Sequence, residues 1–227
     1  MHCLILQGPL YDISIPYAII MMKNVPTILS IWSDEPSHKI ELLREYAIDI
    51  VLNTKPIPII PTTAGSGRVN YPNTTLVNGC KRAKELGFTH AMQFRVDNYC
   101  PTIREFIDIF KQQSSEKIVG LCWFHHIVPG SPYGYIMDHI MYGPIDLLIQ
   151  YRSTLQSIDD ERSTEIFLQE SFFKKSPVTY DDSRTQFDFV LNKLVENKQQ
   201  VYFTHHHTEQ GDTIQVYKNQ GSKCQSP

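Results

Sequence analysis

The chain lacks any hydrophobic run long enough to cross a membrane. Its longest apolar stretch covers residues 13–22 and contains Pro16, whereas a spanning helix needs about 20 apolar residues. The apolar start is interrupted early by Gln7, Gly8 and Pro9, so we expect no signal peptide. These absences predict a cytoplasmic protein without a membrane span, although such a protein can still work peripherally at a membrane surface.

Cysteine and positive charge are also scarce. The five cysteines are odd in number and form no C-x-x-C pair, which predicts reduced, mostly buried thiols. The formal charge is −3 and the pI is near 6.3, so the chain lacks the basic excess of a nucleic-acid-binding protein. A phosphorylated ligand would therefore need local hydrogen-bond donors or a metal ion.

Apolar runs alternate with amphipathic stretches, as in α/β proteins. Strands are predicted at 3–6, 27–32, 50–53, 90–94, 117–124, 135–142, 200–204 and 213–217. Helices are predicted at 14–23, 39–46, 72–86, 102–113, 144–153, 163–175 and 185–197. This βαβαβ order is typical of parallel strands joined by right-handed crossovers. We predict a mostly parallel central sheet flanked by helices, in a single domain over 1–218 with a flexible tail at 219–227.

The segment Phe94-Arg95-Val96-Asp97-Asn98 is the most informative stretch, because an apolar strand ends there just before a helix. Ligands of open α/β sheets bind at the carboxyl ends of strands. A carboxylate in that position suits a hard divalent ion, and such ions bridge phosphates. Asp97 is therefore predicted to hold Mg²⁺ or Mn²⁺. The alternative is an acid that only complements a helix dipole.

Two other strand ends carry polar or flexible residues. Gln7, Gly8 and Pro9 follow the first strand, and Ser33 and Asp34 follow the second. Glycine lets the backbone approach a ligand closely, and Asp34 could accept a hydrogen bond from a ribose hydroxyl. We predict a nucleoside site there, with ordinary turn chemistry as the alternative.

A long loop over 56–69 precedes the helix predicted at 72–86, and loops of this length are often functional. Arg68, Asn70 and Asn73 surround the helix start. They could donate hydrogen bonds to the nucleotide or its phosphates, as helix N-termini do. Simple capping of the helix by asparagine explains the same residues.

Four motifs in this order and spacing carry a resemblance to known proteins. They are Gln7-Gly8-Pro9, Leu29 to Ser33, the helix from Asn70-Tyr71-Pro72-Asn73 through Gly79 and Ala83, and Phe94 to Asp97. Over residues 3–110 the chain resembles the WavE-like lipopolysaccharide-synthesis family and, more broadly, glycosyltransferases of the GT-A fold. The resemblance implies a UDP- or GDP-linked sugar donor, a glycan acceptor, and Mn²⁺ or Mg²⁺ as cofactor.

One departure from that pattern concerns the metal. The GT-A motif is Asp-x-Asp, and Arg95 replaces its first acid in this chain. A single carboxylate should hold an ion less well than two. Arg95 could instead contact the diphosphate directly, because a guanidinium matches phosphate geometry.

The resemblance also suggests where a general base would lie. Glu165 follows a glycine-bearing strand by one helix, which is where GT-A enzymes often place a catalytic carboxylate, and Asp138 is the competing acid. Such a base takes the proton of the acceptor hydroxyl as it attacks the anomeric carbon. Each acid could equally be a surface or capping residue.

We therefore predict a glycosyltransferase that moves a sugar from a nucleoside-diphosphate sugar to a glycan or related hydroxyl. A sugar-phosphate nucleotidyltransferase is the nearest alternative, although the glycine-rich, basic loop it needs after the first strand is absent. A non-catalytic binding relic of the fold is a second alternative. A histidine-based metal hydrolase is disfavoured, because adjacent histidines on a strand, as at 125–126, point to opposite faces. The sequence leaves the oligomeric state open.

Overall fold

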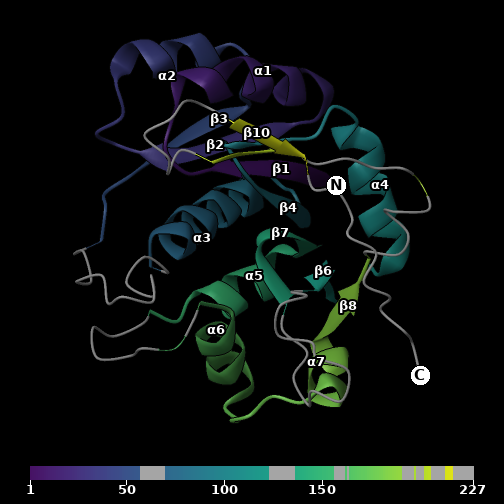
Figure 1. The fold of residues 1–227 in the computed structure, drawn as a ribbon. Coiled ribbons are helices and arrows are strands. Elements are labelled where there is room, and N and C mark those ends of the chain that lie inside the picture. Colours follow the sequence, from purple (N-terminus) through teal and green to yellow (C-terminus); the bar gives the residue numbers. More distant parts are fainter. Residues whose placement is uncertain are drawn as a thin grey trace.

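The computed structural model describes residues 1–56, 70–122, 136–155, 162, 164–190, 197, 202–205 and 213–216. Within these ranges the chain forms a seven-stranded sheet with helices on both faces (Figure 1). The strand order is β3-β2-β1-β4-β7-β6-β8. The strands are β1 (His2–Gln7), β2 (Thr27–Trp32), β3 (Asp49–Asn53), β4 (His90–Arg95), β6 (Ile118–Cys122), β7 (Ile136–Pro144) and β8 (Phe187–Phe189).

The sheet is mostly parallel. Strands β3, β2, β1 and β4 run in one direction, and β6 pairs in parallel with β8. Only β7 among these strands runs antiparallel to its neighbours, β4 and β6. Parallel strands are covered on both faces and are therefore rich in apolar residues, as β1 and β2 are. The predicted α/β fold is confirmed.

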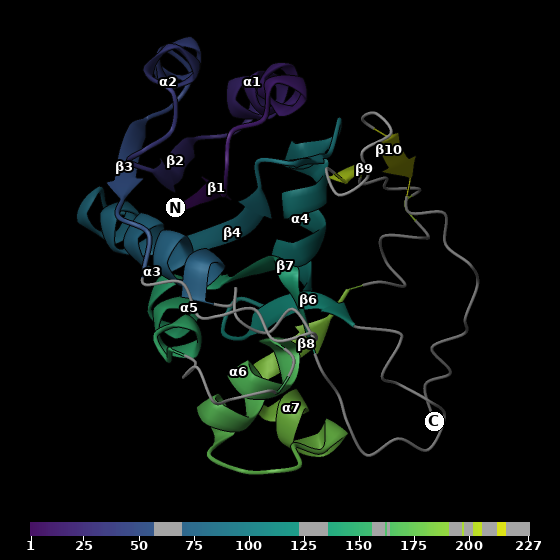
Figure 2. The ribbon, with the colours of Figure 1, turned by 60° about the vertical axis from the view of Figure 1, so that its left-hand side comes forward.

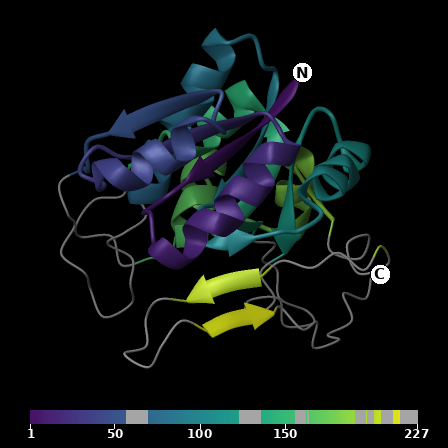
Figure 3. The ribbon, with the colours of Figure 1, turned by 90° about the horizontal axis from the view of Figure 1, so that it is seen from above.

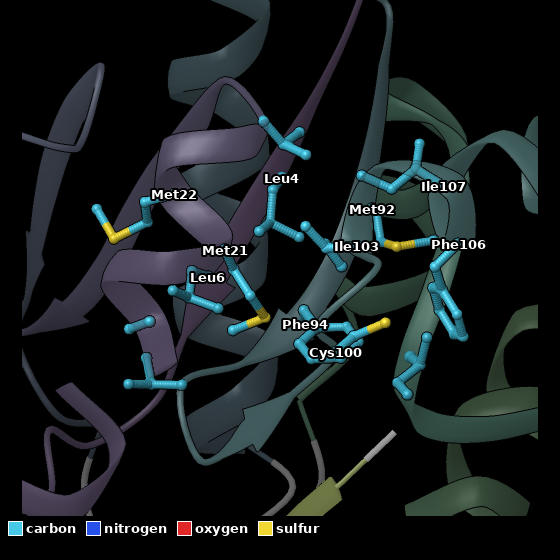
Figure 4. Close-up of a cluster of buried hydrophobic side chains, with 14 of the residues drawn as sticks. Leu4, Leu6, Met21, Met22, Met92, Phe94, Cys100, Ile103, Phe106 and Ile107 are labelled. Atoms are coloured by element: carbon cyan, nitrogen blue, oxygen red, sulfur yellow. The ribbon is translucent and has the colours of Figure 1, made fainter. Parts of the chain in front are cut away.

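Two helical layers cover the two faces of the sheet (Figure 2). Alternate residues of β1 lie in different cores, because successive strand side chains point to opposite faces. Leu4 and Leu6 pack with α1 (Ile15–Asn24), α2 (Ser37–Arg44) and α4 (Ile103–Gln113), as Figure 4 shows in part. Cys3 and Ile5 pack with α3 (Asn70–Glu85), α5 (Ile145–Arg152) and α6 (Thr164–Phe173).

Helix α3 lies unusually close to the sheet. A Cβ atom on Gly79 would come within 2.7 Å of Cγ2 of Ile5 and 3.1 Å of Cβ of Ser30. Glycine is therefore required at the crossing of α3 over β1 and β2. This close approach brings the first turns of α3 against the polar residues that end these strands.

Two differences from the predicted elements concern the second half of the chain. The helix predicted over 185–197 is wrong at 187–189, which form β8. Phe187 is fully buried there against Tyr151, so sheet pairing and aromatic packing outweigh the amphipathic pattern. The sequence analysis also missed α7 (Tyr180–Gln186), which starts at a capping box between Thr179 and Asp182. Residues 191–196 lie outside the described residues.

A second, three-stranded antiparallel sheet joins distant parts of the chain. It contains β5 (Asn98–Tyr99), β9 (Tyr202–His205) and β10 (Thr213–Val216), and Figure 3 shows β9 and β10 side by side. The strands at 202–205 and 213–216 are as predicted, whereas β5 is not. No helix in the described ranges combines the length and apolarity that crossing a bilayer requires. The predicted single domain stays a prediction, and its tail lies outside these ranges, as does most of the loop at 56–69.

Candidate functional site

Four neighbouring strands each place a buried polar side chain on the sheet face that α3 covers. These residues are Asn53 of β3, Ser30 of β2, Gln7 of β1 and Gln93 of β4, and none is more than 2% exposed. Gln7 alternates in step with Ile5, which packs on the α3 side, so its side chain points to the same face. We call these four residues the polar layer.

The polar layer is hydrogen-bonded to α3. The Thr75 hydroxyl donates to Oε1 of Gln7 at 2.8 Å, and the Ser30 hydroxyl donates to the Thr75 carbonyl at 2.6 Å. Nδ2 of Asn53 donates to the Ser30 hydroxyl at 3.0 Å, and Asn78 donates to Oδ1 of Asn53 at 2.8 Å. Buried polar groups are tolerated when they are paired in this way. The helix and the strand ends are therefore held together by polar contacts as well as apolar ones.

A fully buried arginine closes the other end of the polar layer. Arg152, at the end of α5, donates to Oδ1 of Asn73 at 3.0 Å and to Oε1 of Gln93 at 3.1 Å. Nδ2 of Asn73 donates to the Thr154 carbonyl at 3.1 Å. Asn73 was predicted to donate to the nucleotide, but the structure engages both ends of its amide within the protein. The sequence analysis missed Arg152.

Two buried amides at the same edge keep an unsatisfied hydrogen-bond donor. Nε2 of Gln7 and Nδ2 of Asn98 have no hydrogen-bond partner among the described residues, and the two side chains are 1% and 2% exposed. The chain leaving β4 stays beside β1, because the Val96 amide donates to the Gln7 carbonyl at 2.8 Å. A buried unpaired donor costs about 1–3 kcal/mol. A ligand oxygen at this edge would remove that penalty.

Arg95 and Asp97 form an ion pair next to Gln7. Arg95 is the register partner of Gln7 on the adjacent parallel strand, and alternation places it on the α3 face with Gln93. Its Nε donates to Oδ1 of Asp97 at 2.7 Å, and its Nη2 donates to Oδ2. The side chain of Asp97 is 9% exposed and that of Arg95 is 37% exposed. The carboxylate is thus buried beneath the guanidinium.

An aromatic pair flanks the same edge. Trp32, the last residue of β2, packs edge-on against Tyr71 in the first turn of α3, with ring centroids 5.4 Å apart. Trp32 is buried and Tyr71 is half-buried. Asn70, predicted as a ligand, is 7% exposed beside Tyr71. Neither aromatic residue was predicted as part of the site, although both lie within the sequence motifs.

The nucleoside residues predicted after β1 and β2 lie where expected, at the carboxyl edge. Gly8 has φ of +111°, a conformation that glycine adopts at little cost, and Pro9 follows it. The Ser33 amide donates to the Asn53 carbonyl at 2.8 Å. Oδ2 of Asp34 accepts from Nζ of Lys55 at 2.7 Å, and this bond holds the pKa of Asp34 below its ordinary value. A ribose hydroxyl would therefore compete with Lys55.

The predicted general bases lie on elements that follow β4 in the chain, α6 and β7. Glu165 is 8% exposed in the first turn of α6, a helix that packs against α5. The backbone of Asp138 lies in β7, but its side chain is outside the description, and Arg68 is outside the described residues altogether. The catalytic parts assigned to Glu165 and Asp138 stay predictions.

The donor set for a metal ion is poor in the described part of the chain. No three His, Cys, Asp or Glu side chains gather there in a group that could hold an ion. Both carboxylate oxygens of Asp97 accept hydrogen bonds from Arg95. The side chains of the histidines at 125, 126, 139 and 205–207 lie outside the described side chains. The metal assignment of Asp97 stays a prediction, and these residues do not fit it well.

No family model and no curated protein matches the chain, so its resemblance to the WavE-like family stays a prediction. Three solved structures are similar over most of its length. A protein from Bacillus anthracis assigned provisionally as a glucose-1-phosphate thymidylyltransferase, in complex with sucrose, covers 89% of this chain, with 88% of its own length matched, 9% identity and a TM-score of 0.48.

The other two similarities are of the same kind. HddC from Yersinia pseudotuberculosis covers 89% of this chain and 92% of its own, with 12% identity and a TM-score of 0.44. A 4-diphosphocytidyl-2C-methyl-D-erythritol synthase from Anaerococcus prevotii covers 83% and 86%, with 11% identity and a TM-score of 0.44. The names stand closer to the nucleotidyltransferase alternative than to a glycosyltransferase. TM-scores below 0.5 decide nothing about activity, so the site itself must carry that argument.

Proposed function

We propose that the chain binds a nucleoside-diphosphate sugar at the carboxyl edge of β1, β2 and β4, and transfers the sugar to a hydroxyl of a glycan or related acceptor. The observation that carries the proposal is the unpaired Nε2 of Gln7, a buried residue that is the register partner of Arg95. Folding leaves a hydrogen-bond donor unsatisfied there, and ligands of α/β sheets bind at this edge.

This reaction requires the protein to stabilise the leaving group and to accept a proton. The acceptor hydroxyl attacks the anomeric carbon while the bond to the diphosphate breaks, so negative charge builds on the departing nucleoside diphosphate. Positioned cations and N–H donors stabilise such charge. In this proposal the cation is Arg95 and the N–H donor is the side-chain amide of Gln7. The hydroxyl proton passes to a carboxylate, for which Glu165 and Asp138 are the proposed bases.

A sugar-phosphate nucleotidyltransferase is the second candidate, and the same edge could hold a nucleoside triphosphate. The two reactions differ in their products. A glycosyltransferase releases a nucleoside diphosphate from its sugar donor. A nucleotidyltransferase instead joins a nucleoside triphosphate to a sugar 1-phosphate, which forms the nucleoside-diphosphate sugar and releases pyrophosphate. The short segment 7–10 after β1, without a glycine-rich basic loop, favours the glycosyltransferase.

Calorimetric titration of the full chain with UDP and GDP tests binding first. We expect one of the two to bind, and its sugar conjugates to release the diphosphate when a glycan mixture is present. Absence of binding for both nucleotides would end the proposal. Pyrophosphate release from triphosphates and sugar 1-phosphates would assign the second candidate instead, and binding without turnover would indicate a non-catalytic protein.

A further inference from the structure

We infer that Arg95, rather than a divalent cation, supplies the positive charge that holds the ligand's diphosphate, and that Asp97 is the positioning residue that fixes the guanidinium. The inference rests on the proposed function, because it concerns the same ligand. It departs from the metal site that the Asp-x-Asp motif would provide. Three features of the carboxyl edge carry it.

The first feature is the geometry of the ion pair. Nε and Nη2 of Arg95 bond to the two oxygens of Asp97, which is the bidentate arrangement that fixes the plane of a guanidinium. The carboxylate is 9% exposed and the guanidinium side chain is 37% exposed. The carboxylate of Asp97 therefore lies inside, and the side chain of Arg95 lies toward the solvent, where an anionic ligand would arrive.

The second feature is the set of oxygens available to an ion. Mg²⁺ sites in enzymes that bind phosphorylated substrates use one or two carboxylates together with the substrate phosphates. Here both oxygens of Asp97 already accept hydrogen bonds from Arg95, and an ion on either oxygen would lie next to a like charge. No further group of acids or histidines in the described residues compensates for that repulsion.

The third feature is the nature of the neighbouring polar atoms. The unsatisfied buried atoms that the structure describes at this edge, Nε2 of Gln7 and Nδ2 of Asn98, are both N–H donors. Donors of this type attract phosphate oxygens and offer nothing to a cation. Together with a fixed guanidinium, they form an edge suited to an anion.

The test measures UDP and GDP affinity by calorimetry, once with Mn²⁺ and once with EDTA. We expect the two affinities of the unmodified chain to agree within about twofold. Arg95→Lys should weaken binding of the better nucleotide about 5- to 10-fold in EDTA, because a lysine cannot make the bidentate contact. Arg95→Asp places a second acid two residues before Asp97, and should lose binding in EDTA by more than tenfold.

Asp97→Asn separates positioning from a purely structural role. We expect it to weaken binding of the nucleoside diphosphate severalfold in EDTA and to leave the affinity for the nucleoside alone, measured by ligand-observed NMR, unchanged. A structural role would change both affinities. If this variant does not fold, Arg95→Lys retains the ion pair and the same comparison of diphosphate with nucleoside applies to it. Arg44→Lys, which alters an exposed pair with Glu41 on α2, is the control.

The outcomes distinguish this inference from the proposed function. Binding by the unmodified chain in Mn²⁺ but not in EDTA would overturn the inference and keep the function. Unchanged EDTA affinity of Arg95→Lys or Arg95→Asp would overturn it as well. Equal losses for the diphosphate and the nucleoside in the variant used for that comparison would also overturn it. Absence of nucleotide binding under both conditions would remove the proposed function itself.

Discussion

Replacing Gln7 by methionine separates the stability of the protein from its ligand binding. Gln7 is 1% exposed, its Oε1 accepts from the Thr75 hydroxyl at 2.8 Å, and its Nε2 is unpaired. Methionine has a similar length and adapts to irregular spaces without a polar group. The change loses one neutral hydrogen bond of about 1 kcal/mol and removes an unsatisfied donor that costs about 1–3 kcal/mol.

The expected net change in the free energy of unfolding is therefore between zero and about 2 kcal/mol of added stability. The Thr75 hydroxyl is not stranded, because it also lies 3.2 Å from the Tyr71 carbonyl and can donate there. A ligand that needs the Gln7 amide would lose a hydrogen bond of about 1–1.5 kcal/mol. Its dissociation constant would therefore rise about 5- to 13-fold. Urea unfolding and calorimetric titration with UDP or GDP measure the two effects on the same samples.

Thr75→Val is the matched control for this experiment. It breaks the same hydrogen bond from the helix side, leaves Gln7 in place, and should destabilise the fold by about 1–2 kcal/mol with little effect on nucleotide affinity. The reasoning would be refuted if Gln7→Met lost more than about 2 kcal/mol of stability and kept its affinity. Gln7 would then be a structural residue of the polar layer and not a ligand contact.

Two further predictions concern the stability of the fold. Arg152→Met should destabilise the protein by about 2–4 kcal/mol in urea unfolding, because it leaves the buried oxygens of Asn73 and Gln93 without their donor, and a change under 1 kcal/mol would contradict that. The hydrogen bond from Lys175 helps lower the pKa of Asp182 to about 2 from its ordinary 3.8, so its contribution to the start of α7 should persist above about pH 4 and fade as pH falls toward 2. An NMR titration of the carboxyl group measures this directly, and a midpoint at its ordinary value would refute it.

The sheet was predictable because its parallel strands are buried on both faces. Residues 27–32 form a mostly apolar run closed by turn residues, and such runs can be recognised without knowledge of the partner strand. Strand β8 was not predictable in the same way, since Phe187 follows a short helix and gains its extended form only from pairing with β6. Local pattern is a weak guide where one aromatic residue and a neighbouring strand decide the structure.

The residues of the candidate site at the strand ends could be proposed from the sequence, and those beneath the strand ends could not. Gln7, Arg95 and Asp97 were identified because they follow apolar runs, and their common edge follows from parallel pairing. The deeper partners, Arg152 and Gln93, interrupt apolar patterns in a helix and a strand. Such interruptions are a usable signal, because a polar residue at a core position is expensive unless something across the fold pairs with it. The partner itself is set by tertiary contact and cannot be obtained from spacing.

The ion pair could have been anticipated from the sequence with one more step. Arg95 ends a strand and Asp97 lies in the turn directly after it, so their opposite charges are close enough along the chain for the two side chains to pair. With a net charge of −3, no broad positive field draws a diphosphate to this chain. We therefore propose that the guanidinium and nearby amides would hold such an anion at close range. A carboxylate whose oxygens already accept hydrogen bonds from a guanidinium is a poor ligand for an ion. For this reason we propose that an arginine at position 95, where the Asp-x-Asp motif has its first acid, changes phosphate recognition at this edge from metal-bound to direct.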